Sequence, residues 1–159
     1  REWVYAYIPQ FGDFDFRARV GWDPGPVRQL LSVKLSTAPF EEGPAQMTYH
    51  QVAEGRAEIN AAIQGGPRVT FEAPSAGFHD FRFVRVGEQY TAYFDGRPVL
   101  EGIGTPARPS MVVMFFSGPQ DADVNLFVDS ISVVPEPGTC CALSGLLLLV
   151  LKRGIRGKQ

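Results

Sequence analysis

Residues 13–20 read DFDFRARV, and this stretch decides the fold class. Its even positions are apolar and its odd positions are charged, which is the period of two expected of a β-strand with one buried and one solvated face. Similar alternation recurs along residues 2–134, interrupted by Gly, Pro and Asp at intervals of roughly eight to twelve residues. We therefore predict an all-β fold, an antiparallel jelly-roll β-sandwich without an amphipathic helix among these residues.

The alternation predicts eleven strands, and two of them carry further information. The run 111–116, MVVMFF, is apolar on both faces, so it is expected inside a sheet rather than at its edge. The alternation of 124–134 changes phase near Asp129, which predicts a β-bulge. The predicted strands are 3–8, 13–20, 29–35, 47–52, 57–63, 68–72, 78–86, 89–94, 97–101, 111–116 and 124–134.

Residues 78–100, FHDFRFVRVGEQYTAYFDGRPVL, contain a hairpin signal and a family resemblance. Asp95-Gly96 favours a two-residue type I′ turn, because both of its central positions need positive φ. The stretch resembles laminin-G or concanavalin A-like lectin/glucanase domains, in which an aromatic strand runs through a Gly turn into Tyr-x-x-Tyr-Phe-Asp-Gly. Together with the closing FVDSISV, the resemblance implies that residues 1–134 form one such domain, with its last strand beside its first.

The sequence offers little support for catalysis. The enzymatic branch of the resembled fold uses a Glu-x-Asp-x-(x)-Glu strand, and this chain does not contain that pattern. The closest substitute is Asp13 with Asp15, which would lie about 7 Å apart on one face. His50 and His79 have no nucleophile motif and are interpreted as strand-surface histidines. We expect a non-catalytic protein, and a glycan-active hydrolase or lyase on the same fold is the alternative.

Aromatic side chains supply the candidates for ligand binding. If Ala92 and Phe94 face the core, Tyr93 lies on the outer surface, beside Arg82 or Arg85 from the neighbouring strand, where it could stack on a sugar ring. Trp22 is a second candidate platform. Packing into the sandwich is the competing interpretation for both aromatics. A purely structural adhesin, with no ligand, is a further alternative.

Charge and composition limit cofactors and partners. Without the four cations after residue 139, eleven Lys and Arg face seventeen Asp and Glu, a net charge of 11 − 17 = −6, which argues against nucleic-acid binding. Both cysteines, Cys140 and Cys141, lie in the apolar segment near the end, so no disulfide is expected in residues 1–139. Asp121 and Asp123 are weak calcium candidates, and no other cofactor is expected.

The last 25 residues combine a rigid spacer, an apolar segment and terminal cations. Pro135-Glu136-Pro137 is followed by the apolar residues 140–151 and by a basic tail at 152–158 that holds Lys152, Arg153, Arg156 and Lys158. As a helix the apolar segment would span about 18 Å, short of the roughly 30 Å hydrocarbon core, so snorkelling cations would have to assist it. A buried C-terminal helix is the alternative.

The order of these three parts resembles the PEP-CTERM sorting signal of Gram-negative exosortase systems. The resemblance implies that residues 135–159 direct an exported protein to an exosortase-type processing enzyme, with transient anchoring in the inner membrane through a short hydrophobic helix. Export also leads us to expect a signal peptide upstream of Arg1. The implied destination is the cell surface or extracellular matrix, where the sandwich could bind exopolysaccharide or envelope glycan.

Overall fold

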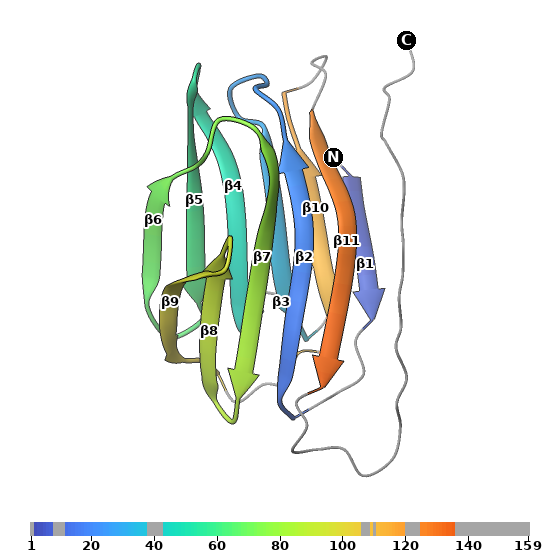
Figure 1. Cartoon of the computed structure of the whole chain (residues 1–159), viewed down its shortest axis with the longest axis vertical. Coiled ribbons are helices and arrows are strands. Elements are labelled where there is room, and N and C mark those ends of the chain that lie inside the picture. The colour runs from blue at the N-terminus through green and yellow to red at the C-terminus, as the bar shows by residue number, and fades with distance from the viewer. Residues whose placement is uncertain are drawn as a thin grey trace.

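The computed structural model describes residues 2–7, 12–37, 43–105, 109, 111–119 and 125–135, and these contain eleven β-strands (Figure 1). Every predicted strand is confirmed, with each end within two residues of the prediction. The strands are β1 (Glu2–Tyr7), β2 (Phe14–Trp22), β3 (Leu30–Ser36), β4 (Ala45–Ala53), β5 (Arg56–Ile63), β6 (Arg68–Glu72), β7 (Gly77–Val86), β8 (Gln89–Phe94), β9 (Arg97–Ile103), β10 (Met111–Ser117) and β11 (Leu126–Pro135).

The strands form two antiparallel sheets packed face to face, in a jelly-roll β-sandwich (Figure 1). One sheet has six strands in the order β1-β10-β3-β4-β5-β6, and the other has five in the order β11-β2-β7-β8-β9. As predicted, β10 lies inside its sheet, and its outward-facing Val113 is buried as fully as the inward Val112 and Met114. The predicted bulge is also confirmed, because the register of β11 against β2 shifts between Val128 and Ser130.

The prediction that the last strand pairs beside the first is wrong. β11 pairs with β2, whereas β1 pairs with β10 in the other sheet. The apolar β10 lies between β1 and β3, so β10 occupies the place beside β1 that was predicted for the last strand. β11, whose exposed residues include Asp129 and Ser130, suits a sheet edge with one solvated face.

Large aromatic side chains fill the space between the sheets. Phe14, Phe16 and Trp22 of β2 point inward and are at most 1% exposed, and Trp22 stacks on Tyr49 from the other sheet at a centroid distance of 4.3 Å. Burying a side chain of this size contributes about 2–3 kcal/mol, so packing alone can hold the sandwich together without a disulfide.

The predicted type I′ turn joins β8 to β9. Asp95 and Gly96 have φ of 48° and 77°, and Phe94 pairs with Arg97 across the turn. The Asp95 carboxylate also accepts a hydrogen bond of 2.8 Å from the backbone N–H of Asp80 on β7. The turn therefore connects β8 to β9 and also holds the end of β8 against β7, its neighbour on the other side.

The predicted sorting segment is described only at its first residue, Pro135, which ends β11. Glu136, Pro137, the apolar segment with its predicted helix, and the four cations lie outside the described residues. Within the described ranges, the chain forms no helix with the length and hydrophobicity needed to cross a bilayer.

Candidate functional site

The predicted Arg82–Tyr93 pair forms on the outer face of the five-stranded sheet. Arg82 on β7 lies opposite Tyr93 on β8, and its guanidinium carbon is 4.8 Å from the Tyr93 ring centroid. Ala92 and Phe94 are buried, so Tyr93 faces outward as predicted. One side of the ring is therefore already covered by a guanidinium group, which reduces its value as a free platform for a sugar.

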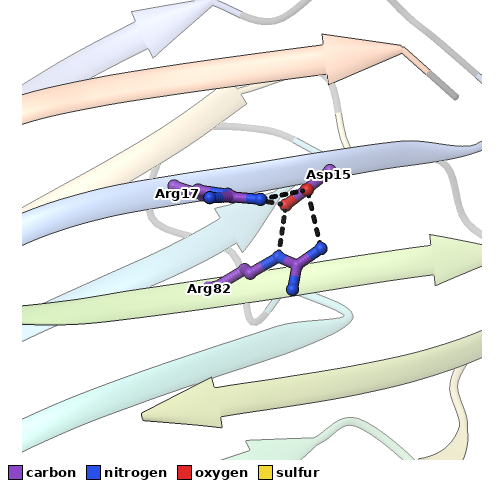
Figure 2. A network of polar contacts seen from close by, with 3 residues as sticks. All are labelled: Asp15, Arg17 and Arg82. Atoms are coloured by element: carbon purple, nitrogen blue, oxygen red, sulfur yellow. Dashed lines mark hydrogen bonds and ion pairs between the residues drawn. The ribbon is translucent and has the colours of Figure 1, made fainter. Parts of the chain in front are cut away.

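The Asp15 carboxylate on β2 binds the same guanidinium group (Figure 2). Arg82 Nε and Nη2 donate to the two carboxylate oxygens of Asp15 at 2.8 and 2.8 Å, and Arg17 Nη2 donates at 3.0 Å. Burial acts to raise the pKa of Asp15, but hydrogen bonds and charge from Arg82 and Arg17 outweigh it, and the pKa lies below its usual value. The carboxylate is therefore fully engaged with two cations.

The Asp13–Asp15 pair does not form a catalytic arrangement. Asp13 Oδ1 accepts a hydrogen bond of 2.7 Å from the backbone N–H of Gly87, whereas Asp15 binds Arg82 and Arg17. Each carboxylate thus makes a structural bond to a different partner, and the pKa of Asp15 is lowered, whereas a general acid needs a raised one.

The prediction that Arg85 lies near Tyr93 on the surface is wrong. Arg85 is three residues after Arg82 on the same strand, and residues three apart on a strand face opposite sides. Its side chain points into the sandwich, where it is 5% exposed and lies against Tyr90.

For Trp22, packing into the sandwich is confirmed, and the alternative of an exposed platform is wrong. β2 continues to Trp22 in the same alternation as Phe14 and Val20, so the indole points inward and is 0% exposed. Its ring stacks between Tyr49 and His79 at centroid distances of 4.3 and 4.5 Å, and its Nε1–H donates to the Pro74 carbonyl at 2.9 Å.

His79 likewise differs from its interpretation as a surface residue. Its side chain is only 12% exposed, and its Nδ1 lies 2.7 Å from Asp95 Oδ2. The ring stacks against Trp22 and Phe94, because His79 has the same inward orientation on β7 as Phe81. His50 lies half-buried on β4, at an outward position of the six-stranded sheet.

The outer face of the six-stranded sheet carries a row of neutral polar side chains, which we call the polar ladder: Ser32, Thr48, Asn60 and Thr70. Each residue lies directly opposite the next on the neighbouring strand, across β3, β4, β5 and β6. The Ser32 and Thr48 hydroxyls are 2.8 Å apart, and Thr70 Oγ1 donates to Asn60 Oδ1 at 2.6 Å. The half-buried aromatic Phe115 on β10 lies opposite Ser32 and continues the row.

Charged and amide side chains flank the polar ladder on both sides. His50, Glu58 and Glu72 are in register across β4, β5 and β6 on one side, and Arg56 donates to Glu58 at 2.7 Å. The other side carries Lys34, Gln46 and Arg68. Within the described residues, neither the amide nitrogen of Asn60 nor the ring of His50 makes a hydrogen bond. This face can therefore donate and accept hydrogen bonds to a bound molecule.

No ladder residue was among the predicted site residues. The signal was present in the sequence, because the outward positions of 47–52, 57–63 and 68–72 alternate with inward apolar residues and include Thr48, Asn60 and Thr70. Alternation alone cannot show that these positions align, since alignment depends on the register between strands.

A cleft of about 520 Å³ lies beside this face, where the edge strands β6 and β9 approach each other. Its floor is mainly apolar, with Phe71, Phe94 and Val99, and Glu72 and Arg97 are its charged lining residues. Glu72 is shared with the row that flanks the ladder.

The calcium candidates Asp121 and Asp123 lie outside the described residues. Within the described part of the chain, no three His, Cys, Asp or Glu side chains gather in a way that could hold a metal ion.

The chain matches no protein-family model and no curated protein sequence. Its fold is similar to solved galectins. A tetrameric galectin from the ball sponge Cinachyrella has a TM-score of 0.60 and 13% identity, over 82% of this chain and 98% of the galectin. Galectin LEC-6 from Caenorhabditis elegans has a TM-score of 0.55 and 16% identity, over 82% and 89%. Sheep galectin-11, solved with glycerol, has a TM-score of 0.53 and 11% identity, over 84% and 96%.

At these identities the comparisons show a galectin-like jelly-roll sandwich and no more. Galectins are a different family from the laminin-G and concanavalin A-like domains that residues 78–100 resemble, so that resemblance stays a prediction. The sorting-signal resemblance lies in a segment that these structural matches do not address.

Proposed function

We propose that the protein is an exported, non-catalytic, sugar-binding protein that uses the polar ladder to bind an exopolysaccharide or envelope glycan. The observation that carries this proposal is the alignment of Ser32, Thr48, Asn60 and Thr70 across four strands, with Phe115 at the end of the row. Sugars present rows of hydroxyls above weakly apolar ring faces. A ladder of hydroxyl and amide groups beside an aromatic ring matches that chemistry.

The opposite face of the sandwich is a weaker candidate, because its polar groups are already paired with one another. Arg82 is bound by Asp15 and covers Tyr93, so a ligand would have to break charge-assisted hydrogen bonds that already exist. The polar ladder and its flanking residues retain free donors, among them the amide nitrogen of Asn60.

The structural neighbours give general support. They are lectins by name, and the sheep protein was solved with the polyol glycerol. Their similarity concerns the fold, so the ligand of this chain is inferred from its own side chains.

The proposal predicts that Asn60→Ala weakens glycan binding about tenfold, because one buried polar contact to a ligand contributes on the order of 1.4 kcal/mol. A glycan array with residues 1–139 would identify ligands, and calorimetry would compare the variants. Thr91→Ala is the matched control, since Thr91 is a half-buried polar residue on the outer face of the other sheet. If the affinity for the glycan fell with Thr91→Ala but not with Asn60→Ala, the proposal that the polar ladder binds the glycan would be refuted. An array without saturable binding would favour the structural adhesin.

We also propose that residues 135–159 act as a PEP-CTERM-type signal for an exosortase-type enzyme, after transient insertion into the inner membrane of a Gram-negative bacterium. The ordered spacer, apolar segment and cations support this proposal. The charge order favours a tail at the cytoplasmic face and a sandwich outside, because positively charged segments are retained on the cytoplasmic side.

This proposal predicts that the double variant Glu136→Ala/Pro137→Ala, made in the full chain behind a signal peptide in an exosortase-bearing host, is neither processed nor released to the surface. Cell fractionation and the mass of the mature chain would report the outcome. Thr139→Ala, which lies between the motif and the apolar segment, is the control. Normal processing of the double variant would contradict the sorting role.

A further inference from the structure

The cleft of about 520 Å³ between β6 and β9, which we call the β6–β9 cleft, is not part of the polar ladder. The two strands are edge strands of different sheets, and they lie on the same side of the sandwich, away from β1 and β11 (Figure 1). The volume of the cleft is within the range of roughly 300–1,000 Å³ that is typical of ligand pockets. The cleft is therefore large enough to receive a substituent of a bound molecule.

The floor of the cleft is apolar and aromatic. Phe71 on β6 and Phe94 on β8 meet edge to face, with their ring centroids 5.4 Å apart and their planes at 68°. Phe94 is buried, whereas Phe71 and Val99 are only partly buried. An apolar group in the cleft would remove more of the Phe71 and Val99 side chains from water, which favours binding.

Two opposite charges line the same cleft. Glu72 on β6 and Arg97 on β9 are both exposed. Within the described part of the chain, neither side chain forms a hydrogen bond or an ion pair, so both are available to a ligand. The planar guanidinium group of Arg97 can donate two parallel hydrogen bonds to a carboxylate, and the Glu72 carboxylate can accept hydrogen bonds from hydroxyl groups.

Glu72 connects the β6–β9 cleft to the polar ladder. It follows Thr70, the ladder residue of β6, by two positions, so the two side chains lie on the same face and about 7 Å apart along the strand. A sugar unit bound at Thr70 is therefore close enough to place a substituent in the cleft.

From the apolar floor, the available Arg97 guanidinium and the continuity with the polar ladder, we infer that the β6–β9 cleft binds a carboxyalkyl substituent of the glycan. Such a substituent carries a methyl group and a carboxylate on one carbon. The methyl group packs on Phe71 and Val99, and the carboxylate binds Arg97. Repulsion from Glu72 directs the carboxylate to the Arg97 side. The inference rests on the proposed function and adds the chemical class of the sugar.

The test compares N-acetylmuramic acid with N-acetylglucosamine, because the two sugars differ only by a carboxyethyl ether. NMR titrations of the full chain would follow the side-chain amide signal of Asn60 in the ladder and the indole N–H signal of Trp22. The indole donates at 2.9 Å to the carbonyl of Pro74, which lines the cleft, so its signal reports whether the cleft is occupied.

We expect both sugars to shift the Asn60 signal, and we expect only N-acetylmuramic acid to shift the Trp22 signal. N-acetylmuramic acid should also bind about fivefold more tightly, as expected for one ion pair near the surface. Arg97→Gln should abolish this preference and leave the affinity for N-acetylglucosamine unchanged. Val99→Ser, which alters the apolar floor but no charge, should reduce the preference. Arg19→Gln is the matched control, because Arg19 is an exposed arginine on the other sheet.

The outcomes separate this inference from the proposed function. Equal affinities for the two sugars, both weakened by Asn60→Ala, would overturn the inference and leave the ladder as the binding site. A shift of the Trp22 signal that depends on Arg97, without any response at Asn60, would support the cleft and refute the ladder. Free lactate that binds as tightly as N-acetylmuramic acid would overturn the inference, because the cleft would then recognise the acid without the sugar.

Discussion

Asp15 shows how one outward-facing residue can organise the surface of a sheet. It binds Arg82 from the neighbouring strand and Arg17 from its own, and Arg82 in turn covers Tyr93. The carboxylate is only 14% exposed, so these charge-assisted hydrogen bonds are screened less than ordinary surface pairs. The cluster therefore stabilises the five-stranded sheet and leaves little free hydrogen-bonding capacity for a ligand.

We predict that Asp15→Asn lowers the free energy of unfolding by about 2 kcal/mol at pH 7, the typical value for a hydrogen-bonded charged pair. The folded-state pKa of Asp15 lies below its unfolded value of about 3.9, so its contribution is complete above that pH and is lost as the pH falls through the folded pKa. The difference between wild type and variant should therefore shrink below about pH 4.

Urea unfolding at pH 7, 5 and 3 would measure this difference. The matched control is Asp129→Asn, because Asp129 pairs with Arg19 at 3.7 Å with both side chains about half exposed, and such pairs contribute little. An equal loss of stability in both variants would show that the Asp15 cluster contributes no more to stability than an exposed ion pair does.

At the scale of elements, alternation predicted all eleven strands and the bulge near Asp129, and the Asp-Gly dipeptide predicted the turn at Asp95-Gly96. Each of these features depends on residues close together in the sequence. The wrong predictions concern which face of a strand a side chain points to. The predicted strand ends at Val20, which places Trp22 in a loop. In the structure β2 continues for two more residues, so Trp22 lies in the strand and points inward. Arg82 and Arg85 were considered together, although a separation of three residues puts them on opposite faces.

The β8–β9 turn provides a test at this scale. Gly96 has φ of 77° and open space where a Cβ would lie, so Gly96→Ala should cost about 1–2 kcal/mol through backbone strain alone. Gly12→Ala is the matched control, because Gly12 also has open space but no positive φ. Thermal unfolding should show a clear loss in the first variant and no change or a slight gain in the second. Equal melting temperatures would mean that the turn does not need glycine.

At the scale of the whole molecule, the sequence predicted the sandwich but not which strands pair across it. The polar ladder exists because β3, β4, β5 and β6 align in one register. That register depends on contacts between residues distant in sequence, which a period of two does not specify. The ladder therefore could not be predicted from the alternation that predicts every strand.

The pairing of β1 with β10 and of β2 with β11 also determines when the protein can fold during its synthesis. β1 and β2 are synthesised before β10 and β11, so β1 and one edge of β2 have no partner until those later strands have been made. We expect this domain to remain unfolded until then. A polypeptide in that condition can still be threaded through a narrow secretion channel, which a finished sandwich could not enter.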